Sequence, residues 1–319
     1  MKTQRVLVTG ATGFLGHALV AELLSRGAEV TAATRRDATL PAGARIARVG
    51  DLTANTDWSG AVQGCDAVVH CAARVHVMAE SAADPIAAFR LANVQGSACL
   101  ARAAIDAGVK RFVYLSSIKV NGERTERGRP FTEHDVPAPV DPYGVSKLEA
   151  EDALKAITRA AGIELVIIRP PLVYGPGVKA NFLSMTRWLA RGVPLPFGRI
   201  TENRRTLVAL DNLLDLITTT LTHPAAANQT FLAGDGEDLS TAELLRRTAT
   251  ALGKTARLIP VPTALLEGAA AVINRRDLWQ RLGGSLQCSI AHACERLAWS
   301  PPLGVDEGLR RAVSQDLHR

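Results

Sequence analysis

The sequence lacks long apolar runs, has few aromatic residues and carries no dense block of one charge. No stretch of about 18 apolar residues occurs, so we expect no membrane insertion. The N-terminal residues MKTQRVLVTG lack the apolar core of a secretory signal. Aromatic residues make up 4% of the chain, and the 37 Lys and Arg residues are scattered as short pairs. Because nucleic-acid-binding surfaces usually show a basic stripe, we expect no nucleic-acid partner.

Cysteine is also scarce. The five cysteines are Cys65, Cys71, Cys99, Cys288 and Cys294, and no two of them have CxxC spacing. An odd number without paired spacing argues against a disulfide framework and against a zinc site. The histidines show no HxxxH or HExxH spacing either, so no metal is expected. These features favour a cytoplasmic location.

The sequence does contain the alternating pattern of an α/β protein. Its 319 residues are 47% hydrophobic and 21% charged, enough for about two domains of roughly 150 residues each. Short apolar runs alternate with segments of helical periodicity, and the runs lie at 5–10, 29–34, 44–52, 67–73, 111–117 and 164–170. This rhythm predicts a doubly wound parallel sheet, a Rossmann fold, covered by helices on both faces.

The composition changes after Pro170, where Pro and Gly become frequent. One further helix and strand are expected within about 208–234. We therefore predict a Rossmann domain in residues 1–170, completed by 208–234, and a smaller α/β substrate-binding domain in residues 171–319. The second region should lie over the carboxyl ends of the strands, where open α/β sheets bind ligands.

A glycine-rich turn follows the first strand and opens a helix. It reads TGATGFLG, from Thr9 to Gly16. Gly10 permits a tight turn, Gly13 lets the backbone approach a pyrophosphate at the helix N-terminus, and Gly16 allows close helix packing. The turn is therefore predicted to bind a dinucleotide through Gly10, Thr12, Gly13, Phe14, Leu15 and Gly16.

The end of the second strand bears on which dinucleotide is bound. Thr34 stands where NAD-binding chains have an acidic residue, and Arg35 and Arg36 follow it. An arginine here accommodates the 2′-phosphate of NADP. The sequence therefore favours NADP(H), with NAD(H) as the alternative, and places Asp51 and Leu52 beside the adenine.

Three residues further along predict a hydride-transfer site. Tyr143 and Lys147 are four residues apart in YGVSK, which puts them on one face of a helix. A Lys ammonium beside a phenol favours the phenolate and lowers the pKa of the tyrosine. Such a phenol exchanges a proton with a substrate hydroxyl, and Ser117, at the end of a strand, is placed to hydrogen-bond the same oxygen.

The motifs TGATGFLG, VVHCAA, LSS, YGVSK and RPPLVYGPG occur in this order. Together they resemble the extended short-chain dehydrogenases/reductases, in the nucleotide-sugar epimerase/dehydratase/reductase branch, over nearly the whole chain. The resemblance implies that Ser117, Tyr143 and Lys147 form the catalytic trio. It implies a homodimer through a four-helix bundle, to which each subunit contributes helices near 85–107 and 143–161. It also implies cofactor contacts by Cys71, Ala72, Ala73, Asn93, Tyr143, Lys147 and Pro170.

The same resemblance implies a nucleotide-sugar substrate, with contacts from Ser117 and four further residues. Asn181, in KANF, resembles an Asn that contacts the diphosphate or the sugar. Arg205, in NRRTLVALDN, resembles an Arg that binds the nucleotide diphosphate, and Arg281 is a second candidate for that role. Lys119 opens an irregular stretch, 119–142, that is expected to form part of the substrate rim because it lies between Ser117 and Tyr143.

Three functions fit this pattern. The first is an NAD(P)H-dependent carbon-4 ketoreductase that converts UDP-4-keto-6-deoxy-N-acetylglucosamine to UDP-N-acetylquinovosamine in bacterial polysaccharide or O-antigen synthesis. The second is a UDP-hexose 4-epimerase, acting on UDP-glucose or UDP-N-acetylglucosamine with bound NAD. The third is a non-catalytic dinucleotide-binding sensor, which the complete Ser-Tyr-Lys set argues against. Arg35, which suits an exchanging NADP(H), favours the reductase among the three.

Overall fold

The computed structural model describes residues 3–75, 84–178 and 180–314, without the side chains of 180, 181 and 276–278. Its main feature is a seven-stranded sheet with the order β3-β2-β1-β4-β5-β6-β9, in which every neighbouring pair is parallel. The strands are β1 (Arg5–Thr9), β2 (Glu29–Thr34), β3 (Arg45–Arg48), β4 (Ala67–His70), β5 (Arg111–Leu115), β6 (Glu164–Arg169) and β9 (Gln229–Leu232). The doubly wound parallel sheet predicted from the sequence is therefore confirmed.

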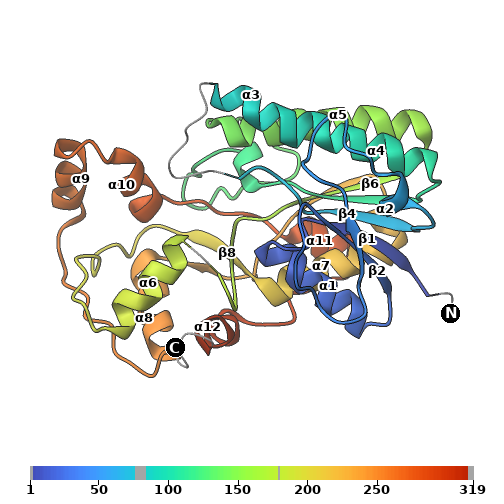
Figure 1. Ribbon diagram of the computed structural model, residues 1–319. Helices are drawn as coiled ribbons and strands as arrows, with labels where there is room; N and C mark the ends of the chain where they lie inside the picture. The colour runs from blue at the N-terminus through green and yellow to red at the C-terminus, as the bar shows by residue number, and fades with distance from the viewer. Residues whose placement is uncertain (1–2, 76–83, 179, 315–319) are drawn as a thin grey trace.

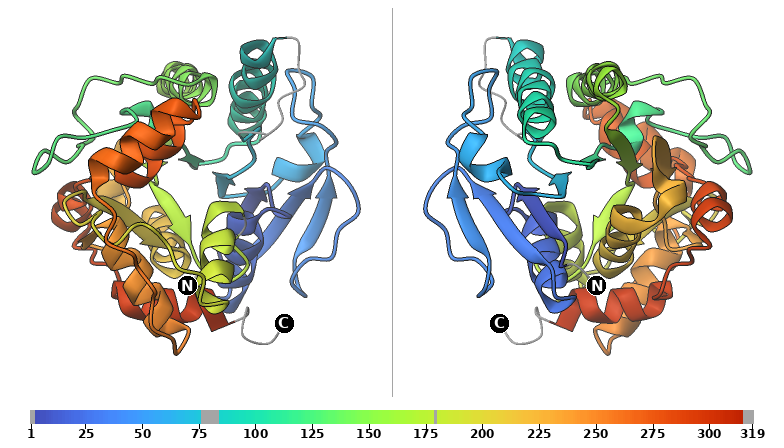
Figure 2. Two further views of the ribbon diagram at one scale, coloured as in Figure 1. Left: turned by 90° about the vertical axis from the view of Figure 1, so that its left-hand side faces the viewer. Right: turned by 90° about the vertical axis from the view of Figure 1, so that its right-hand side faces the viewer.

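Helices cover both faces of this sheet (Figures 1 and 2). One face carries α2 (Ser59–Val62), α3 (Pro85–Phe89), η1 (Arg90–Gly96), α4 (Ser97–Asp106) and α5 (Pro142–Ala161). The other carries α1 (Phe14–Ser25), α7 (Leu210–Thr222) and α11 (Ala291–Leu297). The helix predicted over 85–107 is thus one helical column whose middle, η1, is a π-helix. Each face buries its own apolar cluster, which explains why the central strands are apolar on both sides.

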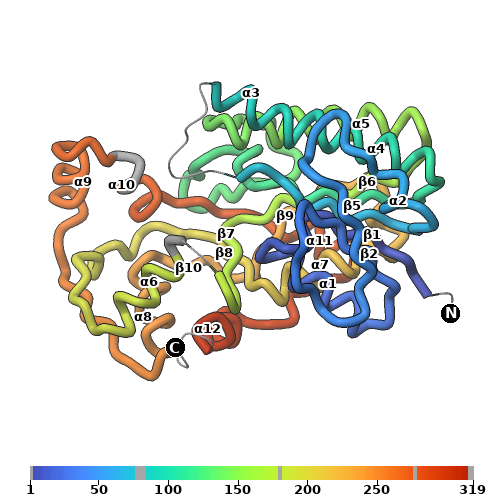
Figure 3. The backbone as a smooth tube through the Cα atoms, viewed as in Figure 1, coloured from blue at the N-terminus to red at the C-terminus, as the bar shows by residue number. Residues whose placement is uncertain are grey.

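A second region is built around a three-stranded sheet with the order β10-β8-β7. Its elements are β7 (Leu172–Tyr174), β8 (Arg205–Ala209), β10 (Asp238–Leu239), α6 (Ala180–Ala190), α8 (Thr241–Ala251), α9 (Thr263–Val272), α10 (Arg276–Gly283) and α12 (Val305–Ser314). In Figure 3 the chain leaves this region after α10 and returns to the large sheet. There Ala293, Leu297 and Trp299 join the core of the large sheet, although the sequence analysis grouped them with the substrate-binding region. Across the described ranges, no helix combines the length and apolarity that crossing a membrane requires.

The carboxyl ends of β1, β4, β5 and β6 all lie at one edge of the large sheet, because these strands are parallel neighbours. The glycine turn follows β1, and Cys71 follows β4. Ser117 lies just after β5, and Pro170 follows β6. Two short 3₁₀ turns, η2 (Ile118–Val120) and η3 (Pro224–Ala226), complete the described elements. The sheet therefore brings together segments that the sequence predicted to form one site.

Candidate active site

The glycine turn is packed so tightly that side chains are excluded from it. Gly10 has φ +67°, and a Cβ there would lie 2.8 Å from the Ala72 nitrogen. A Cβ on Gly16 would lie 2.2 Å from the Gly10 oxygen. Gly13 is the N-cap of α1, so no capping side chain occupies the N–H groups of the first turn. The first turn also holds no acidic residue. The first-turn N–H groups therefore suit a phosphate, so this turn fits the pyrophosphate of a dinucleotide.

The other predicted residues of this turn differ in their exposure. Thr12 is exposed, whereas Phe14 and Leu15 are half-buried and pack on the core beside α1. Their side chains thus anchor the start of the helix that presents its N–H groups to the phosphate.

A buried histidine fastens the glycine turn to the neighbouring strand. His70 Nδ1 lies 2.6 Å from Thr9 Oγ1, which also accepts a bond from the Ala72 nitrogen at 3.1 Å. His70 Nε2 lies 2.8 Å from Ser97 Oγ, and Ser97 in turn donates to the Asn93 carbonyl at 2.5 Å. Burial lowers the pKa of His70 to about 3, so the ring is neutral at pH 7. His70 therefore positions the ends of β1 and β4.

The ribose end of the site is open to solvent. Thr34 is buried, so Arg35 and Arg36, which are exposed, are the side chains that can reach a ribose or its phosphate. Arg35 Nη1 lies 3.4 Å from Asp51 Oδ1. Leu52 is half-buried and packs on the helix column at Gly96. The predicted adenine and phosphate residues are thus close together.

Ser117 and Tyr143 meet at the edge of the sheet, as predicted. Ser117 is the N-cap of η2, where its Oγ accepts a bond from the Lys119 nitrogen at 3.3 Å. Tyr143 lies in the first turn of α5, which Asp141 caps through the Gly144 nitrogen. Burial raises the pKa of Tyr143 to about 12, the Asp141 carboxylate acts in the same direction, and a hydrogen bond with Ser117 opposes both.

Lys147 is buried one helical turn beyond Tyr143. Its Nζ donates to the Leu115 carbonyl at 2.6 Å and to Tyr114 Oη at 3.2 Å. Burial lowers its pKa to about 8, against the opposing field of Glu151. The sequence predicted that this ammonium lowers the pKa of Tyr143. In the structure, burial is the largest influence on that pKa, and it raises the pKa.

A buried ion pair lies behind the predicted catalytic residues, and the sequence analysis missed it. Glu151 and Arg169 are 0% and 3% exposed, and Arg169 makes two bonds to the carboxylate, at 2.5 and 2.9 Å. Ser116, next to Ser117, donates to Glu151 at 2.6 Å. Arg169 also donates to Asn121 Oδ1 at 3.0 Å. Two features of the sequence could have indicated this pair: Glu151 lies four residues beyond Lys147, and Arg169 directly follows the apolar run 165–168 of β6.

Asn93 lies in the π-helix and is 1% exposed. Its amide accepts from the Arg74 nitrogen at 2.8 Å and donates to the Arg74 carbonyl at 3.0 Å. It also donates to Ser146 Oγ at 2.9 Å. Asn93 thereby holds the segment after β4, which contains Cys71, Ala72 and Ala73, against α5. The Asn93 side chain therefore supports the predicted cofactor-binding segment through hydrogen bonds to Arg74 and Ser146.

The predicted substrate residues converge from three parts of the chain. Lys119 Nζ pairs with Asp141 and, at 2.9 Å, with Glu123. Arg205 begins β8, donates to the Gly284 carbonyl at 3.1 Å, and lies within the electrostatic range of Glu123. Burial lowers the pKa of Arg205. Arg205 is half-buried beside this rim, and a diphosphate there would supply the negative charge that a partly desolvated guanidinium favours.

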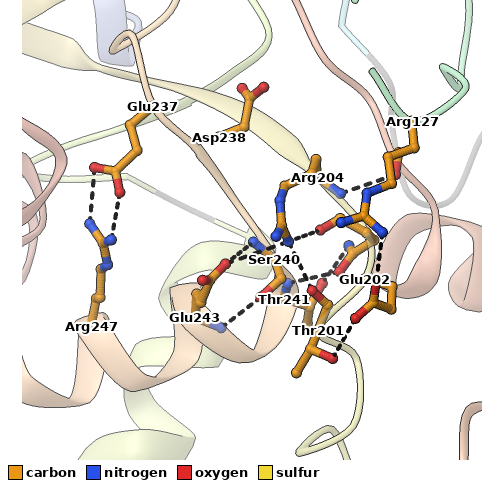
Figure 4. A network of polar contacts seen from close by, with 12 residues as sticks. Arg127, Thr201, Glu202, Arg204, Glu237, Asp238, Ser240, Thr241, Glu243 and Arg247 are labelled. Atoms are coloured by element: carbon orange, nitrogen blue, oxygen red, sulfur yellow. Dashed lines mark hydrogen bonds and ion pairs between the residues drawn. The ribbon is translucent and has the colours of Figure 1, made fainter. Parts of the chain in front are cut away.

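The neighbouring Arg204 is occupied by the protein itself (Figure 4). It donates to the Thr201 carbonyl at 2.8 Å and lies 3.7 Å from Glu243 of α8. Ser240 and Glu243 form a capping box at the start of that helix. Of the two adjacent arginines, Arg204 therefore stabilises α8, which leaves Arg205 as the candidate for a ligand.

The structure shows less about the other two residues predicted to contact the substrate, Arg281 and Asn181. Arg281 is exposed in the last turn of α10, and the chain that follows it runs along β8, where Leu286 pairs with Arg205. Arg281 thus lies on the segment that leads directly to Arg205. The side chain of Asn181 lies outside the described residues, although its backbone belongs to α6.

The irregular stretch 119–142 is tied to the C-terminal region, which the sequence did not reveal. The Thr125 nitrogen donates to the Ser285 carbonyl at 2.9 Å, and the Phe131 nitrogen donates to the Gln287 carbonyl at 2.8 Å. The stretch connects Ser117 to Tyr143, so it borders the site as predicted. Its position is therefore set by the chain that connects α10 to α11.

Comparison with known proteins gives the same family as the motifs. Residues 6–234 match the model of the NAD dependent epimerase/dehydratase family. A UDP-glucose 4-epimerase of Vibrio cholerae is 46% identical over 308 residues, which cover 97% of this chain and 94% of that protein.

Solved structures show the same fold. A UDP-glucose 4-epimerase of Thermotoga maritima, solved with UDP-glucose, has a TM-score of 0.78 at 22% identity and covers 99% of both chains. RMD from Pseudomonas aeruginosa, complexed with NADPH, has a TM-score of 0.75 at 24% identity and covers 99% of this chain and 100% of that one. The glycine turn, the Ser-Tyr-Lys set and the matched family model together show that this chain belongs to the NAD dependent epimerase/dehydratase family, whose members are NAD(P)-binding enzymes.

Proposed function

We propose that this protein is a UDP-hexose 4-epimerase. The observation that carries the proposal is its 46% identity, over nearly its whole length, to a UDP-glucose 4-epimerase. The sequence analysis placed the ketoreductase first, and the comparison favours the epimerase instead. Both activities use the same chemistry at carbon 4 of a nucleotide sugar, so Ser117, Tyr143 and Lys147 take the same roles in either.

The residues of the site divide the work between proton transfer and orientation. A bound NAD(P) supplies the acceptor and donor of hydride. In its phenolate form, Tyr143 accepts the proton of the carbon-4 hydroxyl as the alcohol becomes a ketone, and returns it when the ketone is reduced. Ser117 hydrogen-bonds the same oxygen, and the Lys147 cation, one helical turn away, favours the phenolate against the burial that raises its pKa. The Glu151–Arg169 pair holds Ser116 and thereby fixes the end of β5.

The diphosphate of the substrate is assigned to Arg205, with Arg281 as a second ligand. Arg205 is half-buried and lies close to the rim formed by Lys119 and Glu123. Lys119 and Asn181 are proposed to contact the sugar or the diphosphate from the two sides of the site. A uridine diphosphate fits this set because Arg side chains bind phosphate oxygens in a bidentate manner.

The residues expected near the ribose of the dinucleotide support a second candidate function, the carbon-4 ketoreductase. Arg35 and Arg36 are exposed directly after β2, where a 2′-phosphate would lie. This arrangement favours NADP(H) over NAD(H), and an exchanging NADPH suits a carbon-4 ketoreductase acting on UDP-4-keto-6-deoxy-N-acetylglucosamine. The role in polysaccharide or O-antigen synthesis belongs to this alternative.

Two parallel reactions separate the candidates. The purified protein is incubated with UDP-glucose or UDP-N-acetylglucosamine without added cofactor, and separately with UDP-4-keto-6-deoxy-N-acetylglucosamine and NADPH. The epimerase proposal expects a new carbon-4 epimer in the first reaction with no net redox change. Stoichiometric loss of NADPH in the second reaction, with no epimer in the first, would overturn it in favour of the ketoreductase.

We further propose a cytoplasmic homodimer whose interface uses the α3–α4 column and α5. The two columns lie side by side on one face of the large sheet (Figure 2), and Leu91 is 46% exposed there. An apolar residue on that face suits a buried subunit interface. A Leu91→Asp substitution should convert the dimer to a monomer in sedimentation experiments. A wild-type protein that sediments as a monomer would contradict the proposal.

A further inference from the structure

Outside the active site, three potential metal-ligating side chains meet at one point. Glu133 and His134 belong to the rim stretch 119–142, and His292 lies in the first turn of α11. Glu133 Oε1 lies 3.1 Å from His134 Nε2 and 3.2 Å from His292 Nδ1. All three ligand atoms lie within 4.8 Å of one another. The sequence analysis expected no metal, because the histidines and cysteines lack metal-binding spacing; this cluster escapes such a search because His292 is remote from the other two residues in the chain.

The spacing of these atoms suits a tetrahedral ion. Zinc binds imidazole nitrogen and carboxylate oxygen at about 2.0–2.2 Å, so neighbouring ligand atoms of a tetrahedral site lie roughly 3.3–3.5 Å apart. The two measured N···O separations are within a few tenths of an ångström of that value. Two histidines and one carboxylate also form a common three-residue zinc set that leaves a fourth position for water.

The two ring nitrogens of His292 face different groups. Its Nε2 lies 3.1 Å from Gln229 Oε1, and its Nδ1 faces Glu133 Oε1 at 3.2 Å. Gln229 therefore holds the ring from one side and leaves Nδ1 directed towards Glu133 on the other.

Two of the three side chains are largely buried. Glu133 and His292 are only 11% and 16% exposed, so a cation held between them would be partly shielded from solvent. Among the described residues, the ion-pair partners of Glu133 are histidines rather than Lys or Arg. His134 is 82% exposed, which leaves a path for an ion to enter from solvent.

We propose that Glu133, His134 and His292 form a binding site for a divalent transition metal, with Zn²⁺ as the preferred ion. Imidazole and carboxylate ligands suit Zn²⁺ better than Mg²⁺ or Ca²⁺, which take oxygen ligands. The Gln229 oxygen orients His292 from outside the ligand set, as partners of metal-bound histidines do. The ion joins the rim stretch, which links Ser117 to Tyr143, to the start of α11 on the large sheet.

The test measures binding to the whole, metal-depleted protein. Zn²⁺ is titrated in competition with a chromogenic chelator, and Co²⁺ is added separately because its visible absorption reports a tetrahedral nitrogen and oxygen environment. We expect one equivalent of each ion to bind and Zn²⁺ to raise the melting temperature. Glu133→Gln and His292→Asn should each weaken binding at least about tenfold.

Two matched variants keep the result interpretable. Glu126→Gln removes an exposed carboxylate from the same rim stretch and should bind Zn²⁺ like the wild type. His134→Ala changes an exposed side chain, so it should fold normally and still lose affinity and the Co²⁺ spectrum. Binding that is absent from the wild type, or unchanged in His134→Ala and His292→Asn, would overturn the proposal. Neither outcome depends on which reaction the active site catalyses.

Discussion

The two ends of the proposed dinucleotide site are built in contrasting ways. Behind Ser117, the Glu151–Arg169 pair is almost completely buried, and each partner has further hydrogen bonds. At the ribose end, the side chains of Arg35 and Asp51 are 65% and 76% exposed and lie 3.4 Å apart. A buried, satisfied network fixes geometry, whereas an exposed pair contributes little to stability. We therefore propose that the buried end holds the groups that carry out the reaction, and that the exposed end determines which dinucleotide is preferred.

The largest expected effect is at Tyr143. Tyr143→Phe removes the hydroxyl that exchanges the carbon-4 proton, so turnover should fall by about 10²–10⁴-fold. Dinucleotide affinity should stay near the wild-type value, because the glycine turn is unchanged. Steady-state kinetics and a fluorescence titration with the dinucleotide check the two expectations. Near-normal turnover would show that the buried end does not perform the proton transfer.

The Glu151–Arg169 pair should control stability. Glu151→Leu leaves the Arg169 guanidinium buried and unpaired, so the free energy of unfolding should fall by about 3–5 kcal/mol. The double variant Glu151→Leu, Arg169→Met should lose much less, because neither charge remains. Lys155→Ala is the matched control: Lys155 lies 3.5 Å from Glu151 but is 47% exposed, so its loss should cost under about 1 kcal/mol. Urea unfolding of the four proteins measures the differences, and equal losses in the single and double variants would contradict the account.

Lys147 should make the stability of the buried end depend on pH. Burial lowers its pKa from 10.5 to about 8, so between these values the unfolded chain binds a proton that the folded chain does not. The contribution of Lys147 to stability therefore rises with pH through this window. Lys147→Met lacks this titrating group. If its free energy of unfolding exceeds that of the wild type at pH 7, the difference should shrink as the pH rises to 10. A difference between the two proteins that is constant with pH would show that Lys147 is not desolvated.

The smallest effect on stability is expected at Arg35. Its substitution should instead change the affinity for one dinucleotide selectively. Arg35→Ala should weaken NADPH binding by about 10–100-fold through the lost charged hydrogen bonds, while NADH binding changes little. The free energy of unfolding should stay within about 0.5 kcal/mol. Asp51→Asn, which releases Arg35 from its partner, should leave NADPH binding equal or tighter. Equal weakening of both dinucleotides by Arg35→Ala would remove the argument for NADP(H).

The contrast also explains which features of the fold and the site could be predicted from the sequence. The alternation of apolar runs predicted the parallel sheet, and the spacing of TGATGFLG and YGVSK located the glycine turn and the Tyr143–Lys147 face. Local periodicity does not report partners on other elements, so the Glu151–Arg169 pair was not predicted. For the same reason the contacts of the Lys147 ammonium with Tyr114 and Leu115, and the burial that raises the pKa of Tyr143, were not predicted.

Packing also explains why some strand boundaries differ from those predicted from the sequence. β4 ends at His70 rather than continuing to Ala73, because the following residues turn to meet the glycine turn and Asn93. The return of α11 to the large sheet depends on contacts between distant segments, which no single stretch of sequence encodes. The cluster that contains His292 was hidden for that reason.

The most direct test of the central claim follows the hydrogen at carbon 4. UDP-glucose carrying deuterium at carbon 4 is incubated with the purified protein, and the product is examined by NMR. The account predicts the carbon-4 epimer with the deuterium retained at that carbon, since the hydrogen that leaves carbon 4 returns to it while Tyr143 exchanges only the hydroxyl proton. An epimer that has lost its deuterium to solvent, or no epimer at all, would contradict the account.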